Sequence, residues 1–198
     1  MSLREQKKLK TRRAISHAAT RLFIRRGFEY VTIAEVAEAA RVAKMTVTNH
    51  FGRKEDLVFD IRNDFVDWPA QLVLGAPSVT PFVAVRDGYF AALEERSALL
   101  GFADVGFVRM VRESETLRTA LMQMHLDREL SLVAELTELD RRATILPYAT
   151  GAHLTAVLRL LFDVVWDLTY QGVEPGELVD RVRTAAELAF EQLEPALG

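Results

Sequence analysis

The fold of this chain is decided by residues 32–57, TIAEVAEAARVAKMTVTNHFGRKEDL. Thr32 is followed three residues later by Glu35, and this spacing is a capping box, so a helix should begin here. Apolar side chains then recur at helical spacing and predict one buried face: Ile33, Val36, Ala37 and Ala40. The segment therefore opens with a short amphipathic helix.

A second short helix is predicted over residues 44–50, after a turn at 41–43. Val47 and Phe51 are its apolar anchors, whereas its other face is polar: Lys44, Thr46, Thr48, Asn49 and His50. Asn pairs well with adenine, and Thr offers a methyl group to thymine. A helix, a tight turn and a short polar helix form the arrangement that places a recognition helix in the DNA major groove. Thr32 and Lys54 are candidates for contacts with DNA phosphates that position the protein on the DNA backbone.

This stretch resembles the DNA-binding domain of the TetR family of bacterial transcriptional repressors. The matching residues are the Thr-Ile start, the AEAA-x-V run that ends at Val42, Lys44, Thr46-Val47, His50-Phe51 and Lys54-Glu55-x-Leu57. The resemblance implies that the helix after the turn reads base edges and that Lys54 grips a phosphate. It covers about the first 65 residues strongly, and the remainder only by length and helical pattern.

Three positions depart from the family pattern. Arg41 stands where a turn glycine is usual, so a residue with a side chain has to adopt a left-handed conformation. Ala43 replaces the usual serine cap, which weakens the start of the second helix by about 1 kcal/mol. Thr48 replaces a frequent tyrosine that contacts the DNA backbone, so that contact is shorter here or lost.

The charge of the chain is distributed unevenly along the sequence. Residues 1–57 contain 13 Lys+Arg and 6 Asp+Glu, a balance of +7, and the remaining 12 and 22 give residues 58–198 a balance of −10. A basic head on an acidic body indicates that the head meets a polyanion. There is no cysteine, which excludes disulfides and thiolate metal sites and favours the cytoplasm. We expect no signal peptide and no membrane span.

Helical periodicity through the rest of the chain predicts an all-α fold, with a three-helix head followed by a larger helical bundle. We expect the helix-turn-helix domain over residues 1–53, with a mobile basic arm at 1–10, and an effector-binding and dimerisation domain over 54–198. Phe28 and Tyr30 should pack as core. Beyond the head, helices are expected at 54–68, 81–100, 114–139, 147–170 and 175–194, with Pro69 and Pro195 ending two of them and a loop at 74–81.

The last two predicted helices suggest a dimer interface. Residues 147–170 are apolar on nearly every side, and such a helix should be buried all round. The stripe of the final helix contains small alanines that allow close helix approach: Leu178, Val182, Ala185, Ala186, Ala189, Phe190 and Leu193. Two such helices from each of two copies would form a four-helix interface, as in the resembled family. The alternative is that they only close the core of a monomer.

Enzymatic signatures are missing from the sequence, so we expect no catalytic residues, no metal site and no cofactor. There is no Gly-x-Ser-x-Gly, no P-loop and no Gly-x-Gly-x-x-Gly, and the four histidines show no ligand spacing. Asp163 and Asp167 share a helix face, but a contact with Arg159, with solvent or of one of them with a cationic ligand explains them better than a catalytic or metal-binding pair.

Aromatic and methionine side chains in the body suggest a cavity for a small, largely apolar effector. The candidate lining residues are Phe90, Phe102, Phe107, Met110, Met122, His125, Trp166 and Tyr170. The sequence thus predicts a homodimeric repressor that binds a near-palindromic double-stranded DNA operator and is released by a small molecule. Two alternatives stay open: a DNA-binding regulator without an effector, and a helical small-molecule-binding protein or enzyme whose head has lost DNA binding.

Overall fold

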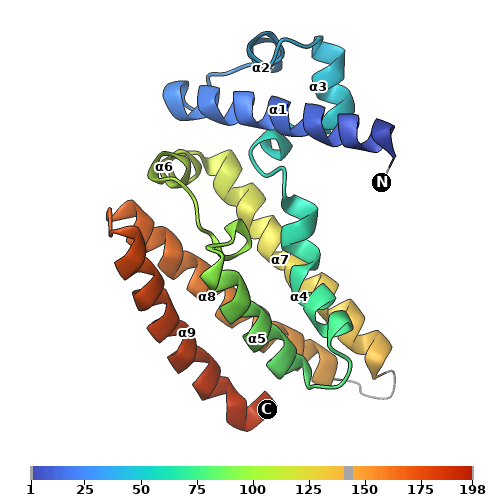
Figure 1. Cartoon of the computed structure of the whole chain (residues 1–198), viewed down its shortest axis with the longest axis vertical. Helices are drawn as coiled ribbons and strands as arrows, with labels where there is room; N and C mark the ends of the chain where they lie inside the picture. Colours follow the sequence, from blue (N-terminus) through green and yellow to red (C-terminus); the bar gives the residue numbers. More distant parts are fainter. Residues whose placement is uncertain (1, 141–144, 198) are drawn as a thin grey trace. The chain divides into compact units, whose positions relative to one another are not determined.

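The computed structural model describes residues 2–140 and 145–197, and over these residues it is all-α, as predicted (Figure 1). The α-helices are α1 (Leu3–Arg26), α2 (Ile33–Ala39), α3 (Lys44–His50), α4 (Arg62–Gly75), α5 (Pro81–Glu94), α6 (Val105–Glu113), α7 (Glu115–Leu139), α8 (Leu146–Tyr170) and α9 (Pro175–Leu197). Two short 3-10 helices are also present: η1 (Glu55–Leu57) and η2 (Ala98–Leu100).

The chain forms two compact units. The first comprises residues 1–62 and 109–120, and the second comprises residues 63–108 and 121–198. The first unit therefore holds α1 to α3 and η1 together with the junction of α6 and α7. The boundary predicted from the sequence, after residue 53, assigns that junction to the second domain instead. Ser114 at the junction donates to the Glu29 carboxylate at 2.7 Å, and its hydroxyl accepts from the Leu117 N–H at the start of α7.

The start of α1 corrects the prediction of a mobile arm over residues 1–10. The helix begins at Leu3 because Ser2 and Glu5 form a capping box: the Glu5 N–H donates to the Ser2 hydroxyl, and the Glu5 carboxylate accepts from the Ser2 N–H. Gly27 ends the helix with a φ of 86°. Beyond it Phe28 is buried as predicted, but Tyr30 is 78% exposed, so the prediction that Tyr30 belongs to the core was wrong.

The course of α4 also differs from the prediction. Residues 55–57 form a 3-10 turn, α4 starts at Arg62, and the helix continues through the buried Pro69 to Gly75. A proline inside a helix leaves the carbonyl four residues earlier without its usual donor, and here that residue is Phe65. The guanidinium of Arg128 on α7 replaces the missing donor, since its Nε donates to the Phe65 carbonyl at 2.9 Å. The proline is tolerated because a distant side chain pairs the carbonyl it orphans.

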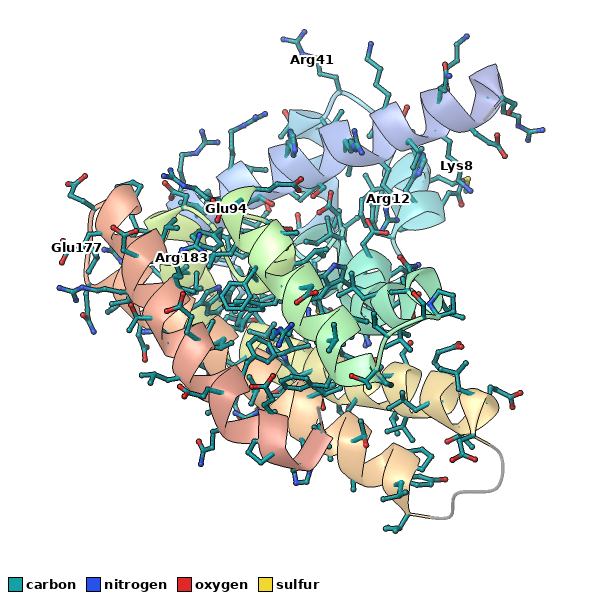
Figure 2. The ribbon with its side chains drawn as sticks, turned by 60° about the horizontal axis from the view of Figure 1, so that its bottom comes forward. Lys8, Arg12, Arg41, Glu94, Glu177 and Arg183 are labelled. Atoms are coloured by element: carbon teal, nitrogen blue, oxygen red, sulfur yellow. The ribbon has the colours of Figure 1, made fainter. Side chains whose placement is uncertain are left out.

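The second unit is a bundle in which α9 packs on α8 and on α5. Thr80 caps α5, which ends at Glu94, earlier than predicted, because η2 and the turns around it interrupt the helix before Leu100. Figure 2 shows Arg183 of α9 and Glu94 of α5, whose side chains form an ion pair. The final helix passes Pro195 and reaches Leu197, which corrects the predicted stop: the carbonyl orphaned by Pro195 belongs to Glu191, an exposed residue whose carbonyl water can reach.

One side of α8 is exposed in the single chain, so the burial of this helix on every side stays a prediction that requires a second copy of the chain. Its buried residues include Leu154, Leu158 and Trp166, whereas Leu160 is 54% exposed. By length and composition alone, α8 is long and apolar enough to cross a membrane, but the core helices of soluble proteins are often equally long and apolar. Asp163 on the exposed side pairs with Arg159 at 3.5 Å, one of the contacts that the sequence left open for it.

Candidate nucleic-acid interface

The turn between α2 and α3 has the geometry that the sequence predicted. The Glu35 N–H donates to the Thr32 hydroxyl at 3.3 Å, and the Glu35 carboxylate accepts from the Thr32 N–H at 2.7 Å, which lowers the pKa of Glu35 to about 2. Arg41 adopts a φ of 56°, the left-handed conformation expected at a position where glycine is usual. Ala43 precedes α3 without a side-chain cap. These features place α3 immediately beyond the turn.

The faces of α3 divide its side chains into two groups. Val47 and Phe51 are buried as predicted, at 1% and 4% exposure. Lys44, Thr48 and Asn49 are exposed, whereas Thr46 and His50 are half-buried. Sequence reasoning missed Met45, which is 72% exposed in the middle of the polar face. The signal was its spacing: Met45 lies four residues before Asn49, and residues four apart share a helix face.

Arg12 of α1 connects that helix to the end of α3. Its guanidinium donates to the His50 carbonyl and lies 4.2 Å from the centre of the Phe51 ring. Both contacts are favourable, because helix C-termini carry partial negative charge and aromatic faces attract cations. Figure 2 shows Arg12 and Lys8 on α1. The sequence indicated Arg12 only as one positive charge among many, since nothing local in it reveals a partner 38 residues away.

His50 is held in a way that limits its role as a donor. Its Nδ1 atom is buried without a hydrogen-bond partner, and burial, with Lys8 and Arg12 nearby, lowers the pKa of His50. The imidazole lies beside Phe51, with ring centres 6.4 Å apart. The exposed face of α3 therefore depends less on His50 than on Lys44, Thr48 and Asn49.

Lys54 has an intramolecular partner that the sequence did not predict. Its Nζ donates to the Phe28 carbonyl at 2.5 Å and lies 4.3 Å from the centre of the Phe28 ring. Burial lowers the pKa of Lys54, an effect opposed by Glu29, Glu35 and Glu55. This ammonium ties η1 to the loop after α1, and a phosphate contact by Lys54 stays a prediction.

Exposed cations are numerous on α1 as well as near α3. Those on α1 are Arg4, Lys7, Lys8, Lys10, Arg13, Arg21, Arg25 and Arg26. Arg26 pairs with Glu35 at 2.8 Å. Arg41, which points outward in Figure 2, and Arg53 are exposed as well. Cations of this kind can contact a polyanionic backbone while α3 presents hydrogen-bonding groups to base edges.

The structure does not bring the predicted effector-pocket residues together. Met122 and Tyr170 are exposed, at 72% and 46%, and Met110 lies buried in the first unit. Phe90 lines a cleft of about 280 Å³ between α5 and α9. Phe102 lines a separate cleft of about 300 Å³ beside the turn that joins α8 and α9.

Phe107, His125 and Trp166 instead join an aromatic cluster in the second unit. The His125 ring contacts the rings of Phe65 and Phe162 at 5.2 and 5.1 Å between centres, and Phe162 continues to Trp166 at 5.0 Å. Phe107 lies 6.5 Å from Trp166. Burial, reinforced by the positive charges of Arg128 and Arg159, lowers the pKa of His125 to about 3, so its imidazole is neutral at pH 7.

Comparison with known proteins also assigns the region of the helix-turn-helix to DNA-binding regulators. Residues 15–61 match the family described as bacterial regulatory proteins, tetR family. The HTH-type transcriptional regulator TcmR of Streptomyces glaucescens is 30% identical over 96 residues, which are 48% of this chain and 34% of that protein. The chain thus spans about a third of the length of the curated relative it matches.

Solved structures of similar fold cover nearly the whole chain. NalD of Pseudomonas aeruginosa, described as the secondary repressor of the MexAB-OprM multidrug efflux pump, aligns with a TM-score of 0.59 and 23% identity over 97% of this chain and 98% of its own. A TetR-family regulator from Mesorhizobium loti aligns with a TM-score of 0.54 and 19% identity over 93% and 96%. At these identities the likeness shows the fold. Residues 15–61 thus match the helix-turn-helix segment of the TetR family of bacterial regulatory proteins, and the chain as a whole shares the fold of the solved regulators.

Proposed function

We propose that this protein is a transcriptional regulator that binds operator DNA through α3 and is released from it by a small molecule. The observation that carries the proposal is the exposed face of α3, where Lys44, Met45, Thr48 and Asn49 lie together at the end of a strongly basic segment. Lys44 and Asn49 suit direct readout, and the Met45 thioether and the Thr48 methyl suit the methyl group of thymine.

The proposed regulator acts as a homodimer. A single helix-turn-helix reads one half-site, and useful specificity needs two half-sites about 34–36 Å apart. The exposed sides of α8 and α9 are the proposed interface, because both carry large apolar side chains in contact with solvent, among them Leu160 and Leu188. As a DNA-binding regulator the protein would act in the cytoplasm, where the DNA of a bacterium lies.

Selection from randomised duplex DNA at two salt concentrations tests the proposal. We expect a near-palindromic motif and an affinity that falls steeply with salt, since phosphate contacts release counterions. A protein that enriches no motif and binds DNA independently of salt would contradict the proposal.

Variants of α3 then locate the reading face. Asn49→Ala should weaken binding to the selected motif by about tenfold and relax the preference at one base pair of each half-site. Lys44→Ala should weaken binding and reduce the salt slope by about 1 for each protomer if it contacts a phosphate. Asn63→Ala is the matched control, because Asn63 is the other asparagine of the chain, is exposed, and lies in α4 outside the proposed DNA contact.

A further inference from the structure

Arg128 is a cation buried without an anion. Its side chain is 1% exposed, and its guanidinium donates to two neutral acceptors, the Phe65 carbonyl at 2.9 Å and the Leu99 carbonyl at 3.1 Å. The guanidinium also lies 3.4 Å from the centre of the Phe65 ring. Within residues 2–140 and 145–197, none of the ion pairs includes Arg128. A fully buried arginine is rare unless a carboxylate or another anion compensates its charge.

His125 adds two unpaired polar atoms next to this cation. It lies three residues before Arg128 on α7, so the two side chains share a helix face, and both contact the Phe65 ring. Its Nδ1 and Nε2 atoms are buried and have no hydrogen-bond partner. A buried donor or acceptor left unpaired is costly, so this position is unfavourable in the empty protein.

We propose that Arg128 and His125 receive the anionic group of the effector, an organic acid whose apolar or aromatic body lies against the Phe65–Phe162–Trp166 cluster. A carboxylate compensates the buried guanidinium charge and accepts from its N–H groups in the paired geometry that arginine favours. The imidazole N–H of His125 supplies one more donor. The inference rests on the proposed function, because it gives the chemical class of the effector invoked there.

Such an anion would act directly on α4 at its proline. Arg128 supplies the donor that Pro69 denies to the Phe65 carbonyl, so an anion that draws the guanidinium away leaves that carbonyl unpaired again. Trp68, whose ring centre lies 5.9 Å from the guanidinium carbon, immediately precedes this proline. Binding would therefore favour a different course of α4, and the ligand would bind that conformation more tightly than the empty one.

Matched ligand pairs test the charge requirement on the free protein. The probes are decanoate, phenylacetate, indole-3-acetate and 1-naphthoate, each compared with its neutral primary amide at equal millimolar concentration. We expect one or more acids to raise the Tm while the amide of the same body does not, with about tenfold or larger selectivity in Kd from titration calorimetry. If none of the four acids raises the Tm more than its amide, the proposal is overturned and Arg128 only supports α4 at Pro69.

Variants assign the selectivity to Arg128. Arg128→Met in the native sequence leaves the Phe65 carbonyl unpaired and threatens folding, so the variant is made together with Pro69→Ala, which restores the helical N–H. The double variant should stay folded and lose the preference for acid over amide, whereas Pro69→Ala alone should keep it. Arg159→Met removes an exposed arginine of α8 and should also keep it. Selectivity that survives in the double variant, or disappears with Arg159→Met, would refute the assignment to Arg128.

DNA binding by the same samples separates this inference from the proposed function. If the protein enriches an operator motif but shows no acid selectivity, the effector class is wrong and the regulator stands. If it shows acid selectivity but no DNA binding, the site at Arg128 stands and the regulator fails.

Discussion

At the scale of single residues, the cations Arg12, Lys54 and Arg128 donate to backbone carbonyls of residues far from them in the sequence. Arg12 donates to the His50 carbonyl, Lys54 to that of Phe28, and Arg128 to that of Phe65. Each carbonyl lies where helical hydrogen bonding is incomplete: the end of α3, the loop after α1, and the site opposite Pro69. Carbonyls without a helical donor carry partial negative charge, so a cation that donates to one of them supplies both the missing hydrogen bond and a favourable charge interaction.

Substitution of Arg41 by glycine should stabilise the protein by about 0.5–1 kcal/mol, because Arg41 holds a φ of 56° that only glycine adopts without cost. Urea denaturation measures the change. Arg41→Ala removes the same charge but keeps a Cβ atom, so it should bring no such gain. Equal stabilities for the two variants would show that the left-handed turn carries no strain.

Replacement of His125 by phenylalanine should reduce the loss of stability in acid. The pKa of His125 is lowered in the folded protein to about 3, so below pH 6.5 the unfolded chain binds a proton that the folded one refuses. Protonation of this one group in the unfolded chain should lower the free energy of unfolding by about 2 kcal/mol between pH 7 and pH 5. Urea denaturation at both pH values should show a smaller difference for the variant. His153→Phe, at an exposed site, should retain the native difference.

At the scale of elements, α4 is held by a contact that lies outside the helix. Its proline would ordinarily end it, and Arg128 on α7 lets it continue for about one and a half further turns to Gly75. The same guanidinium reaches the Leu99 carbonyl in η2. Three elements of the second unit therefore meet at one side chain, and a change at Arg128 affects all of them.

A double-mutant cycle measures this dependence. Arg128→Met alone should cost about 3 kcal/mol or more, since it leaves the buried Phe65 carbonyl unpaired and opens a gap beside the ring. In the Pro69→Ala background the cost should fall by about 1 kcal/mol or more, because the alanine introduced there donates its own backbone N–H to that carbonyl. Denaturation of the four proteins gives the coupling energy. A coupling of zero would mean that the contact seen at 2.9 Å does not compensate for the proline.

At the scale of the whole molecule, the proposed function needs two copies of the chain. The sides of α8 and α9 that a single chain leaves exposed carry apolar residues beside ion pairs, for example Arg159 with Asp163 and Arg181 with Glu177. An apolar centre with charged neighbours is typical of protein–protein interfaces.

Two charges on these helices should separate the proposed dimer. The double variant Leu160→Glu with Leu188→Glu should sediment as a monomer and keep its helical content, because both leucines are exposed in the single chain, at 54% and 63%. Its affinity for the selected palindrome should fall by about a hundredfold or more, as each half-site is then bound separately. Leu126→Glu on α7, where the leucine is 50% exposed, is the control and should remain dimeric. A double variant that still sediments as a dimer would place the interface elsewhere.

Capping and periodicity predicted the DNA-binding element closely, because they act within a few residues. The Thr32–Glu35 box, the turn at Arg41 and the bounds of α3 all follow from neighbours in the chain. Side-chain partners were less accessible to sequence reasoning. Tyr30 was expected in the core and is exposed. Of the predicted pocket residues only Phe107, His125 and Trp166 share one cluster, because such distances depend on how helices far apart in sequence pack.

The sequence by itself determined that this protein is helical and that residues 32–51 form a helix-turn-helix. It also determined that the net positive charge lies in residues 1–57 and the net negative charge in residues 58–198. These properties are local or compositional, so they need no knowledge of the packing. Tertiary structure alone decided that α4 passes through Pro69, that α3 is tied down by Arg12, and that Arg128 is buried beside an unpaired histidine. The residues that make these contacts lie up to 63 positions apart, and only the packed helices bring a guanidinium within hydrogen-bonding distance of the carbonyl that a proline leaves free.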